Sequence, residues 1–106
     1  MITIHKYPLP IADVVRVKMP SGAHPVRVDS INGLAYIWAV VDTDKPEVFH
    51  EYHMFKTGGK MPDDADSLIY IGQVAIYVQM ELMLYVHQYA NNEFKDDFSP
   101  GGFWNE

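Results

Sequence analysis

The segment HEYH, residues 50–53, places two histidines around a glutamate and so invites comparison with a zinc site. In zinc proteases the H-E-x-x-H motif lies on a helix, where histidines four residues apart share one face. Here His50 and His53 are three residues apart, and the alternating pattern of residues 48–55 predicts a strand. On a strand the two rings point to opposite faces. We therefore expect no zinc site in this segment, only partly exposed strand histidines.

The stretch FKTGGKM, residues 55–61, raises the question of a phosphate-binding loop. Such a loop needs the spacing G-x-x-x-x-G-K-[ST] between a strand and a helix, so that backbone N–H groups converge on the phosphates. Gly58, Gly59 and Lys60 do not have this spacing, and an aspartate-rich segment that would repel phosphate follows them. The stretch predicts a turn.

Aspartates at positions 42, 44, 63, 64 and 66 fall into two loops and could supply oxygen ligands to a hard cation. Neither loop has the glycine and distal glutamate of an EF-hand, and aspartate is common in turns for its own hydrogen bonds. No serine stands in a nucleophile-elbow context, and no carboxylate pair is matched for acid and base catalysis. We expect a protein that is not an enzyme and holds no cofactor and no metal.

The composition predicts one soluble globular domain. The chain has 106 residues, of which 48% are hydrophobic and 13% aromatic, and it contains no cysteine. The lack of cysteine excludes disulfides and sulfur-based zinc sites and fits a reducing cytoplasm. A net charge of −6 makes nucleic-acid binding an unlikely role, although residues 1–30 carry +2 and leave room for a local basic face.

We expect no membrane association. The longest apolar run, residues 34–41, is too short to cross a bilayer, and the first ten residues lack the apolar core of a signal peptide. These features favour a cytosolic protein.

Alternation with a period of two dominates the chain and predicts strands. The predicted strands cover residues 14–19, 26–31, 34–42, 48–55, 68–78 and 80–89. Asn32-Gly33 predicts a hairpin turn, because this pair adopts positive φ at both central positions at little cost. Gly72 indicates a bulge.

Two of these segments need a choice. Residues 34–42 are apolar in both alternating sets, which predicts a central strand covered on both sides. Residues 80–89 would be apolar all round as a helix, whereas as a strand they separate into two faces, and we favour the strand. The predicted fold class is all-β: an antiparallel small sandwich or partly open barrel of six or seven strands, with a short C-terminal tail or helical turn.

The domain is expected to span residues 1–89, followed by an acidic, aromatic tail over residues 90–106. The tail interleaves large apolar residues with acidic ones, and it could form one helical turn at residues 92–98. Such anchors can fill a partner's pocket or fold back onto their own domain, and both alternatives stay open. The candidate partner-binding residues are Phe94, Asp96, Asp97, Phe98, Phe103 and Trp104.

Several motifs, taken in order, resemble a family of small uncharacterised phage and prophage proteins. They are HKYPLPI, VKMPSGA at residues 17–23, NGLAYIWAVVD at 32–42, TGG at 57–59, and YIGQV at 70–74 followed by LYVHQY. The likeness covers about residues 3–89. It implies a phage origin but no reaction and no catalytic residue. The family's usual G-T-G is T-G-G here, and the tail lies outside the likeness.

Three functions follow as hypotheses. The first is a phage-encoded accessory protein in the host cytoplasm that binds a host or phage protein, for example as an inhibitor of a host enzyme or defence system. The second is a structural or virion-associated homo-oligomer. The third is a small-ligand-binding protein that uses tyrosine, tryptophan and histidine side chains on one sheet face, where His50, His53 and His87 are the candidate ligand or metal residues.

Overall fold

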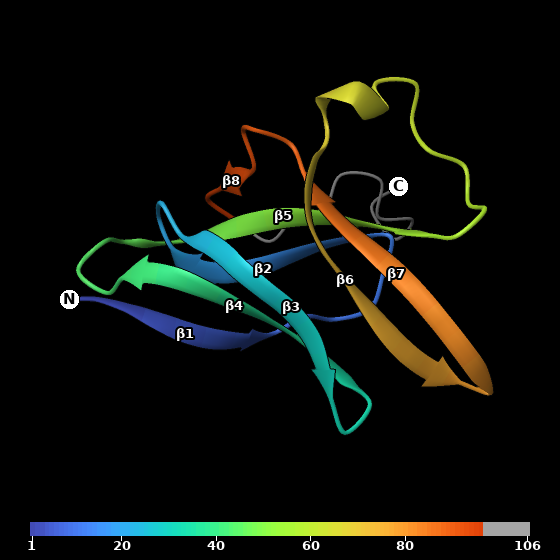
Figure 1. The fold of residues 1–106 in the computed structure, drawn as a ribbon. Helices are drawn as coiled ribbons and strands as arrows, with labels where there is room; N and C mark the ends of the chain where they lie inside the picture. The colour runs from blue at the N-terminus through green and yellow to red at the C-terminus, as the bar shows by residue number, and fades with distance from the viewer. Residues whose placement is uncertain (97–106) are drawn as a thin grey trace.

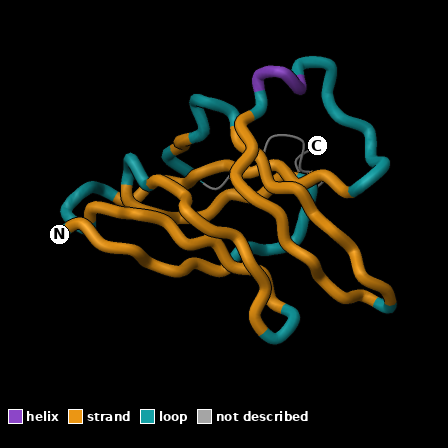
Figure 2. The backbone as a smooth tube through the Cα atoms, viewed as in Figure 1, coloured by secondary structure: helices purple, strands orange, loops and turns teal. Residues whose placement is uncertain are grey.

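A computed structural model of the chain, which describes residues 1–96, is an all-β structure with one short 3₁₀ turn, η1 (Ala65–Ser67) (Figures 1 and 2). The strands are β1 (Ile2–Pro8), β2 (Val14–Pro20), β3 (His24–Ile31), β4 (Leu34–Asp42), β5 (Glu47–Lys56), β6 (Ile69–Val78), β7 (Met80–Gln88) and β8 (Glu93–Phe94). The predicted fold class is confirmed. The six predicted strands are all present, and β1 and β8 are the additions. Within residues 1–96 no helix is long and apolar enough to cross a membrane.

The strands form two antiparallel sheets that do not close into a barrel. One sheet has the order β1-β4-β3, and the other has the order β2-β5-β7-β6, with β8 also paired to β5. β3 and β6 run close to each other at one side of the molecule, whereas β1 and β2 are the strands at the opposite ends of the two sheets. The architecture is therefore a sandwich that is open along one side (Figure 1).

The sequence left an extended tail or one helical turn open for residues 92–98, and within the described residues this segment contains the short strand β8. Phe94 pairs with Phe49, and the Glu51 amide donates to the Asn92 carbonyl at 2.8 Å. β7 pairs with the later part of the same strand, from His53 onward. After β7 the chain forms a loop over residues 89–92 and then pairs with β5 through β8.

The core lies between the two sheets and takes mostly alternate residues from the strands β2 to β7. β2 supplies Val15, Val17 and Met19, and β4 supplies Ala35, Ile37, Ala39 and Val41. β5, β6 and β7 add Tyr52, Met54, Val74, Ile76, Leu84 and Val86. Burial of these apolar side chains is the main stabilising contribution. The strand prediction for residues 80–89 is confirmed, because Leu84 and Val86 enter the core with the spacing of a strand.

β4 is central in its sheet, as predicted, but the expectation that both of its sides are covered is wrong. The odd-numbered side chains from Ala35 to Val41 are buried, whereas Tyr36, Trp38 and Val40 are half-buried and Leu34 is 62% exposed. The alternation of the sequence cannot distinguish a second layer of protein from solvent, since both alternating sets are apolar. The outer side of the sheet β1-β4-β3 therefore exposes several apolar side chains.

The predicted hairpin turn between β3 and β4 is confirmed. Asn32 has φ of 52° and Gly33 has φ of 81°, the backbone of a turn with positive φ at both central residues.

Gly72 lies where the two sheets approach each other most closely along β3 and β6. The register of β6 against β7 shifts between Tyr70 and Gly72, which confirms the predicted bulge. A Cβ atom placed on Gly72 would stand 3.3 Å from the Cβ and Cγ2 atoms of Val28. The absence of a side chain here lets β6 cross close to β3.

We predict that Gly72→Val lowers the free energy of unfolding by about 1–3 kcal/mol, because the added atoms overpack the contact with Val28. Urea unfolding of the single variant, of Val28→Ala and of the double variant measures this. The double variant should lose less than the sum of the two single variants. Additive losses would contradict a direct steric contact between these positions.

Candidate functional site

His53 and His87 lie opposite each other on adjacent strands, β5 and β7, on the outer side of the sheet β2-β5-β7-β6. We call this side the histidine face, and it is formed by Arg16, Glu51, His53, Phe55, Tyr70, Tyr85 and His87. His50 points the other way, into the core. The predicted divergence of His50 and His53 is confirmed.

His50 corrects the expectation of partly exposed histidines, since it is only 1% exposed. Its Nε2 atom lies 3.1 Å from the carbonyl oxygen of Pro20, so the ring is held by the backbone at the end of β2. His50 therefore belongs to the packing of the sandwich and not to a surface site.

Aromatic rings surround the two surface histidines. The His53 ring meets Tyr89 edge-on with centroids 5.1 Å apart, and His87 meets Phe55 and Tyr70 with centroids 5.5 Å apart in each case. Phe55 also stacks near His53 at 6.5 Å. Edge-on arrangements of this kind are favourable between aromatic rings. Across residues 1–96, no three His, Cys, Asp or Glu side chains are arranged to hold a metal ion.

Glu51 is the one acidic group of the histidine face that is buried. Its Oε2 atom accepts from Nε of Arg16 at 3.0 Å and lies 3.0 Å from Nη2, while its Oε1 atom lies 3.1 Å from Nε2 of His53. The side chains of Arg16 and Glu51 are only 5% and 9% exposed. In a buried ion pair, the attraction between the two charges offsets the free energy lost when both are removed from water, provided that the hydrogen-bond geometry is good. The sequence did not predict this pair, because Arg16 and Glu51 lie 35 positions apart on different strands.

Arg16 also fastens the segment that follows β7. Its guanidinium stacks 3.7 Å from the centroid of Phe94, and Nη1 donates to the carbonyl oxygen of Asp96 at 3.1 Å. Asp96 Oδ1 lies 3.6 Å from the same nitrogen. Of the predicted partner-binding residues, Phe94 therefore packs on its own domain, and Asp96 pairs with Arg16. Asp97, Phe98, Phe103 and Trp104 lie outside the described residues.

Glu93 adds a second attachment for β8. Its carboxylate accepts from the Ser21 hydroxyl and from the Gly22 amide, both at 2.8 Å. These hydrogen bonds lower the pKa of Glu93, and the bond from the Gly22 amide has the larger effect. The turn after β2 is thus joined to the strand after β7.

The glycine-lysine stretch forms a turn after β5. Gly58 has φ of 79°, and the Gly59 amide donates to the Lys56 carbonyl at 2.9 Å. The loop continues to η1, where the Tyr89 hydroxyl donates to Asp64 Oδ1 at 2.9 Å, and this bond raises the pKa of Tyr89. Asp64 therefore acts as a hydrogen-bond acceptor within the fold.

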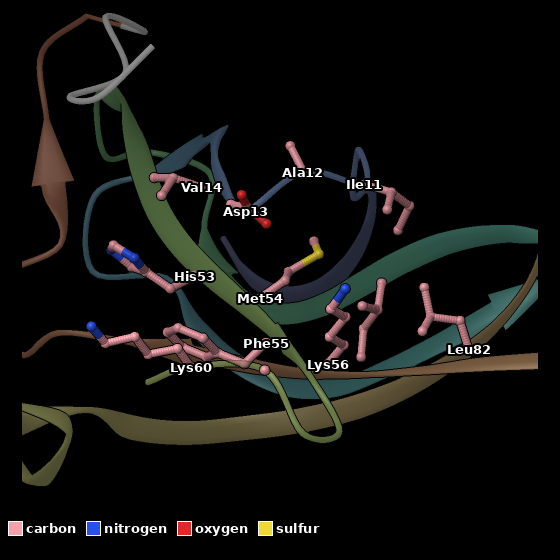
Figure 3. Close-up of a pocket in the computed structure, with 12 residues that line it drawn as sticks. Ile11, Ala12, Asp13, Val14, His53, Met54, Phe55, Lys56, Lys60 and Leu82 are labelled. Atoms are coloured by element: carbon pink, nitrogen blue, oxygen red, sulfur yellow. The ribbon is translucent and has the colours of Figure 1, made fainter. Parts of the chain in front are cut away.

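A pocket of about 460 Å³ opens beside this turn, at the edge of the histidine face (Figure 3). Its walls come from the segment before β2, the end of β5, the following turn and β7. The lining residues are Ile11, Ala12, Asp13, Val14, His53, Met54, Phe55, Lys56, Gly59, Lys60, Leu82 and Leu84. Of the three candidate histidines, His53 lines the pocket, while His50 and His87 do not. A pocket of this size and mixed lining can hold a small molecule.

The opposite sheet presents the second candidate surface, which we call the β1–β4–β3 face. Its outward apolar side chains are Ile2, Ile4, Ile31, Leu34, Tyr36, Trp38 and Val40, and the charged residues Lys6, Arg27, Asp29 and Asp42 point outward among them. Ile2 is 73% exposed and Ile4 is 56% exposed. Apolar side chains gather at both ends of this side, Ile2, Ile4 and Val40 at one end and Ile31 and Leu34 at the other, and Lys6, Arg27 and Asp29 lie beside Tyr36 and Trp38 between them.

The basic residues near the N-terminus are divided between the two faces. Lys6 stands 4.7 Å from the ring centroid of Tyr36, and Arg27 stands 4.7 Å from that of Trp38, so both lie on the β1–β4–β3 face. Arg16 lies on the histidine face instead. The sequence had left open whether these residues form one basic patch, and they do not.

We predict that Glu51→Ala lowers the free energy of unfolding by about 3–5 kcal/mol, because it removes the buried carboxylate and leaves the guanidinium of Arg16 with the exposed Asp96 carboxylate alone, 3.6 Å away. Urea unfolding measures the loss. Asp29→Ala is the matched control: it removes the carboxylate of the exposed Arg27–Asp29 pair and should cost less than about 1 kcal/mol. Equal losses in the two variants would show that burial of the Arg16–Glu51 pair has no special weight.

We predict that acid releases β8 before the rest of the sheet. The pKa of Glu93 is lower in the folded protein than in the unfolded chain, so its contribution to stability is complete above its usual pKa of 4.5 and is lost as pH falls through the folded value. Amide hydrogen exchange of Gly22 and Glu51 across this range measures the release. In Glu93→Gln the protection of the Gly22 amide against exchange should no longer fall as pH is lowered through this range. A protection that still falls as in the wild type would contradict the role of the Glu93 carboxylate.

A family model described as a domain of unknown function (DUF7352) matches residues 1–97 and so includes all eight strands and the β8 attachment. No curated protein and no solved structure matches the chain. The family match covers nearly the whole sequence, and the chain therefore belongs to the DUF7352 family.

Proposed function

We propose that this protein is a phage-encoded accessory protein that works by binding another protein through the β1–β4–β3 face. The observation that carries the proposal is the apolar outer side of this sheet. Single exposed apolar residues are common on protein surfaces, but several exposed apolar residues that gather on one side of a sheet beside polar ones are typical of an interaction site. Leu34 and Ile4 are more than half exposed there.

The side-chain types of the face support the same conclusion. Tyr36 and Trp38 lie side by side, with ring centroids 6.3 Å apart, and Arg27 stands over Trp38. Tryptophan, tyrosine and arginine are the residues that most often dominate binding energy at interfaces. Half-buried rings held by cation contacts are already ordered, so a partner would bind them at a small entropic cost.

The phage origin is supported by the ordered motifs of residues 3–89, and it suggests the host cytoplasm as the place of action. An inhibitor of a host enzyme or defence system is the concrete form of the proposal. The net charge of −6 would favour encounter with a basic partner surface. Phe98, Phe103 and Trp104 remain predicted additional anchors for such a partner.

A second candidate function is the binding of a small ligand in the pocket beside the histidine face. The pocket combines apolar walls, such as Met54 and Leu84, with the amines of Lys56 and Lys60. The two amines outnumber the one carboxylate of the lining, Asp13, so the pocket fits an amphipathic anion. Native mass spectrometry of the protein purified from its host would favour this function if it found a bound molecule of that kind.

We predict that Ile31→Lys/Leu34→Glu lowers recovery of the specific partner at least tenfold when the tagged protein is captured from infected cells. Ile31 pairs with Leu34 across β3 and β4, so the opposite charges preserve the strand pairing while removing apolar surface. Quantitative mass spectrometry of the captured proteins measures the recovery.

The matched control is Tyr77→Lys/Met80→Glu, which removes exposed apolar residues from the end of the β6–β7 hairpin. It should recover the partner as the wild type does. Equal recovery by the face variant and the control would refute the β1–β4–β3 face as the binding surface.

A further inference from the structure

We infer that the free edge of β1 pairs with β1 of a second copy of this chain, which joins the two β1-β4-β3 sheets into one six-stranded sheet. The inference concerns the backbone at the sheet edge and goes beyond the proposed partner, which would bind the face. Three observations carry it: unpaired backbone groups along β1, the character of the other sheet edges, and the charges along the symmetric pairing.

The ladder between β1 and β4 determines which backbone groups of β1 remain unpaired. The Thr43 amide donates to the Met1 carbonyl, and the Leu9 amide donates to the Ala35 carbonyl, so the odd-numbered residues of β1 bond to β4. In an antiparallel ladder the intervening residues direct N–H and C=O to the other side. Ile2, Ile4 and Lys6 therefore present their backbone groups outward, and within residues 1–96 no hydrogen bond reaches these groups.

The other edges of the two sheets are protected. β2 directs the backbone of Arg16 and Lys18 outward and ends in Pro20, so charged side chains and a proline interrupt that edge. β3 and β6 run against each other, with Val28 close to Gly72. Charges, prolines and covering strands are the features that prevent edge pairing. β1 also ends in a proline, Pro8, and has Lys6 at its third outward position, but its first two outward positions are the isoleucines Ile2 and Ile4.

A two-fold axis at Ile4 gives the pairing a self-consistent register. Ile4 then faces Ile4 of the second copy, and Ile2 faces Lys6, so the outward groups form up to about six hydrogen bonds between the strands. The two Lys6 side chains stand about 13 Å apart along the strands and do not repel each other strongly. The exposed side chains of Ile2 and Ile4 gain apolar neighbours.

The same register brings opposite charges together. Ile2 pairs with Asp42 on β4, so Lys6 of the second copy, Ile2 and Asp42 lie in one line across three strands. The Cα atoms of Lys6 and Asp42 are then about 10 Å apart on the same face, within reach of an extended lysine side chain. The complementary pair occurs twice, by symmetry. Asp42 also binds the Met1 ammonium of its own chain at 3.3 Å, so Lys6 of the second copy places a second cation beside this carboxylate, and this complementarity favours a second copy as the occupant of the edge.

Proline substitutions test the backbone pairing directly. Ile4→Pro removes an outward N–H and leaves the bonds from β1 to β4 intact, and proline is tolerated at such an edge position. Lys18→Pro makes the same change on the outward edge of β2 and is the matched control. Analytical ultracentrifugation of the full chain over a concentration series measures the mass of the wild type and both variants.

We expect a dimer for the wild type and for Lys18→Pro, and at least a tenfold weaker dimer for Ile4→Pro. A monomeric wild type at about 1 mM would overturn the inference. It would also be overturned if Ile4→Pro dimerised like the wild type, or if both proline variants lost the dimer equally.

Hydrogen exchange of the wild type gives a test that does not depend on any variant folding. The Ile4 and Lys6 amides should exchange at least tenfold more slowly in the concentrated protein than in the dilute protein. The amides of Thr3 and His5, which point toward β4, should show no such change. Exchange of Ile4 and Lys6 that is independent of concentration would overturn the inference.

Discussion

In each strand, successive residues alternate in the direction of their side chains and of their backbone N–H and C=O groups, and both alternations determine the structure of this protein. Every second side chain enters the core between the sheets, and every second pair of backbone groups joins the neighbouring strand. In β4 this places Ala35, Ile37, Ala39 and Val41 inside. In β1 it directs both the side chain and the backbone of Ile4 away from the rest of the chain. A two-layer sandwich covers each sheet on one side only, so the outer sides depend on other contacts.

The two outer sides differ in how far other segments of the chain cover them. On the histidine face, Arg16 and Glu51 form a buried pair, and Arg16 also holds Phe94, so the segment after β7 is fastened there. Desolvation makes the pair costly unless both partners are present, and the covering segment provides that desolvated environment. The β1–β4–β3 face has no comparable cover among the described residues. Only the side chains of Lys6 and Arg27 shield its aromatic rings.

The sequence predicted what depends on local pattern. Alternation identified six of the strands, Asn32-Gly33 identified a hairpin, and strand spacing separated His50 from His53. Its failures concern long-range contacts. The pairing of Arg16 with Glu51 joins residues 35 positions apart, and burial of His50 depends on where β2 ends. The exposure of Leu34 could not be predicted either, because an apolar residue gives the same signal beside a second layer and beside solvent.

The cation contacts on the β1–β4–β3 face do not remove its apolar character. Each such contact at an exposed site contributes about 0.5–1 kcal/mol, and it covers one ring only. Ile2, Ile4 and Leu34 carry no polar atoms beyond the backbone, and each is more than half exposed. Their hydration costs about 25 cal/mol for each Å² of apolar area, a cost that the fold itself does not require, because polar residues would serve equally well on a solvent-facing strand. Contact with another protein would remove that cost, and the unpaired edge of β1 adjoins the same face.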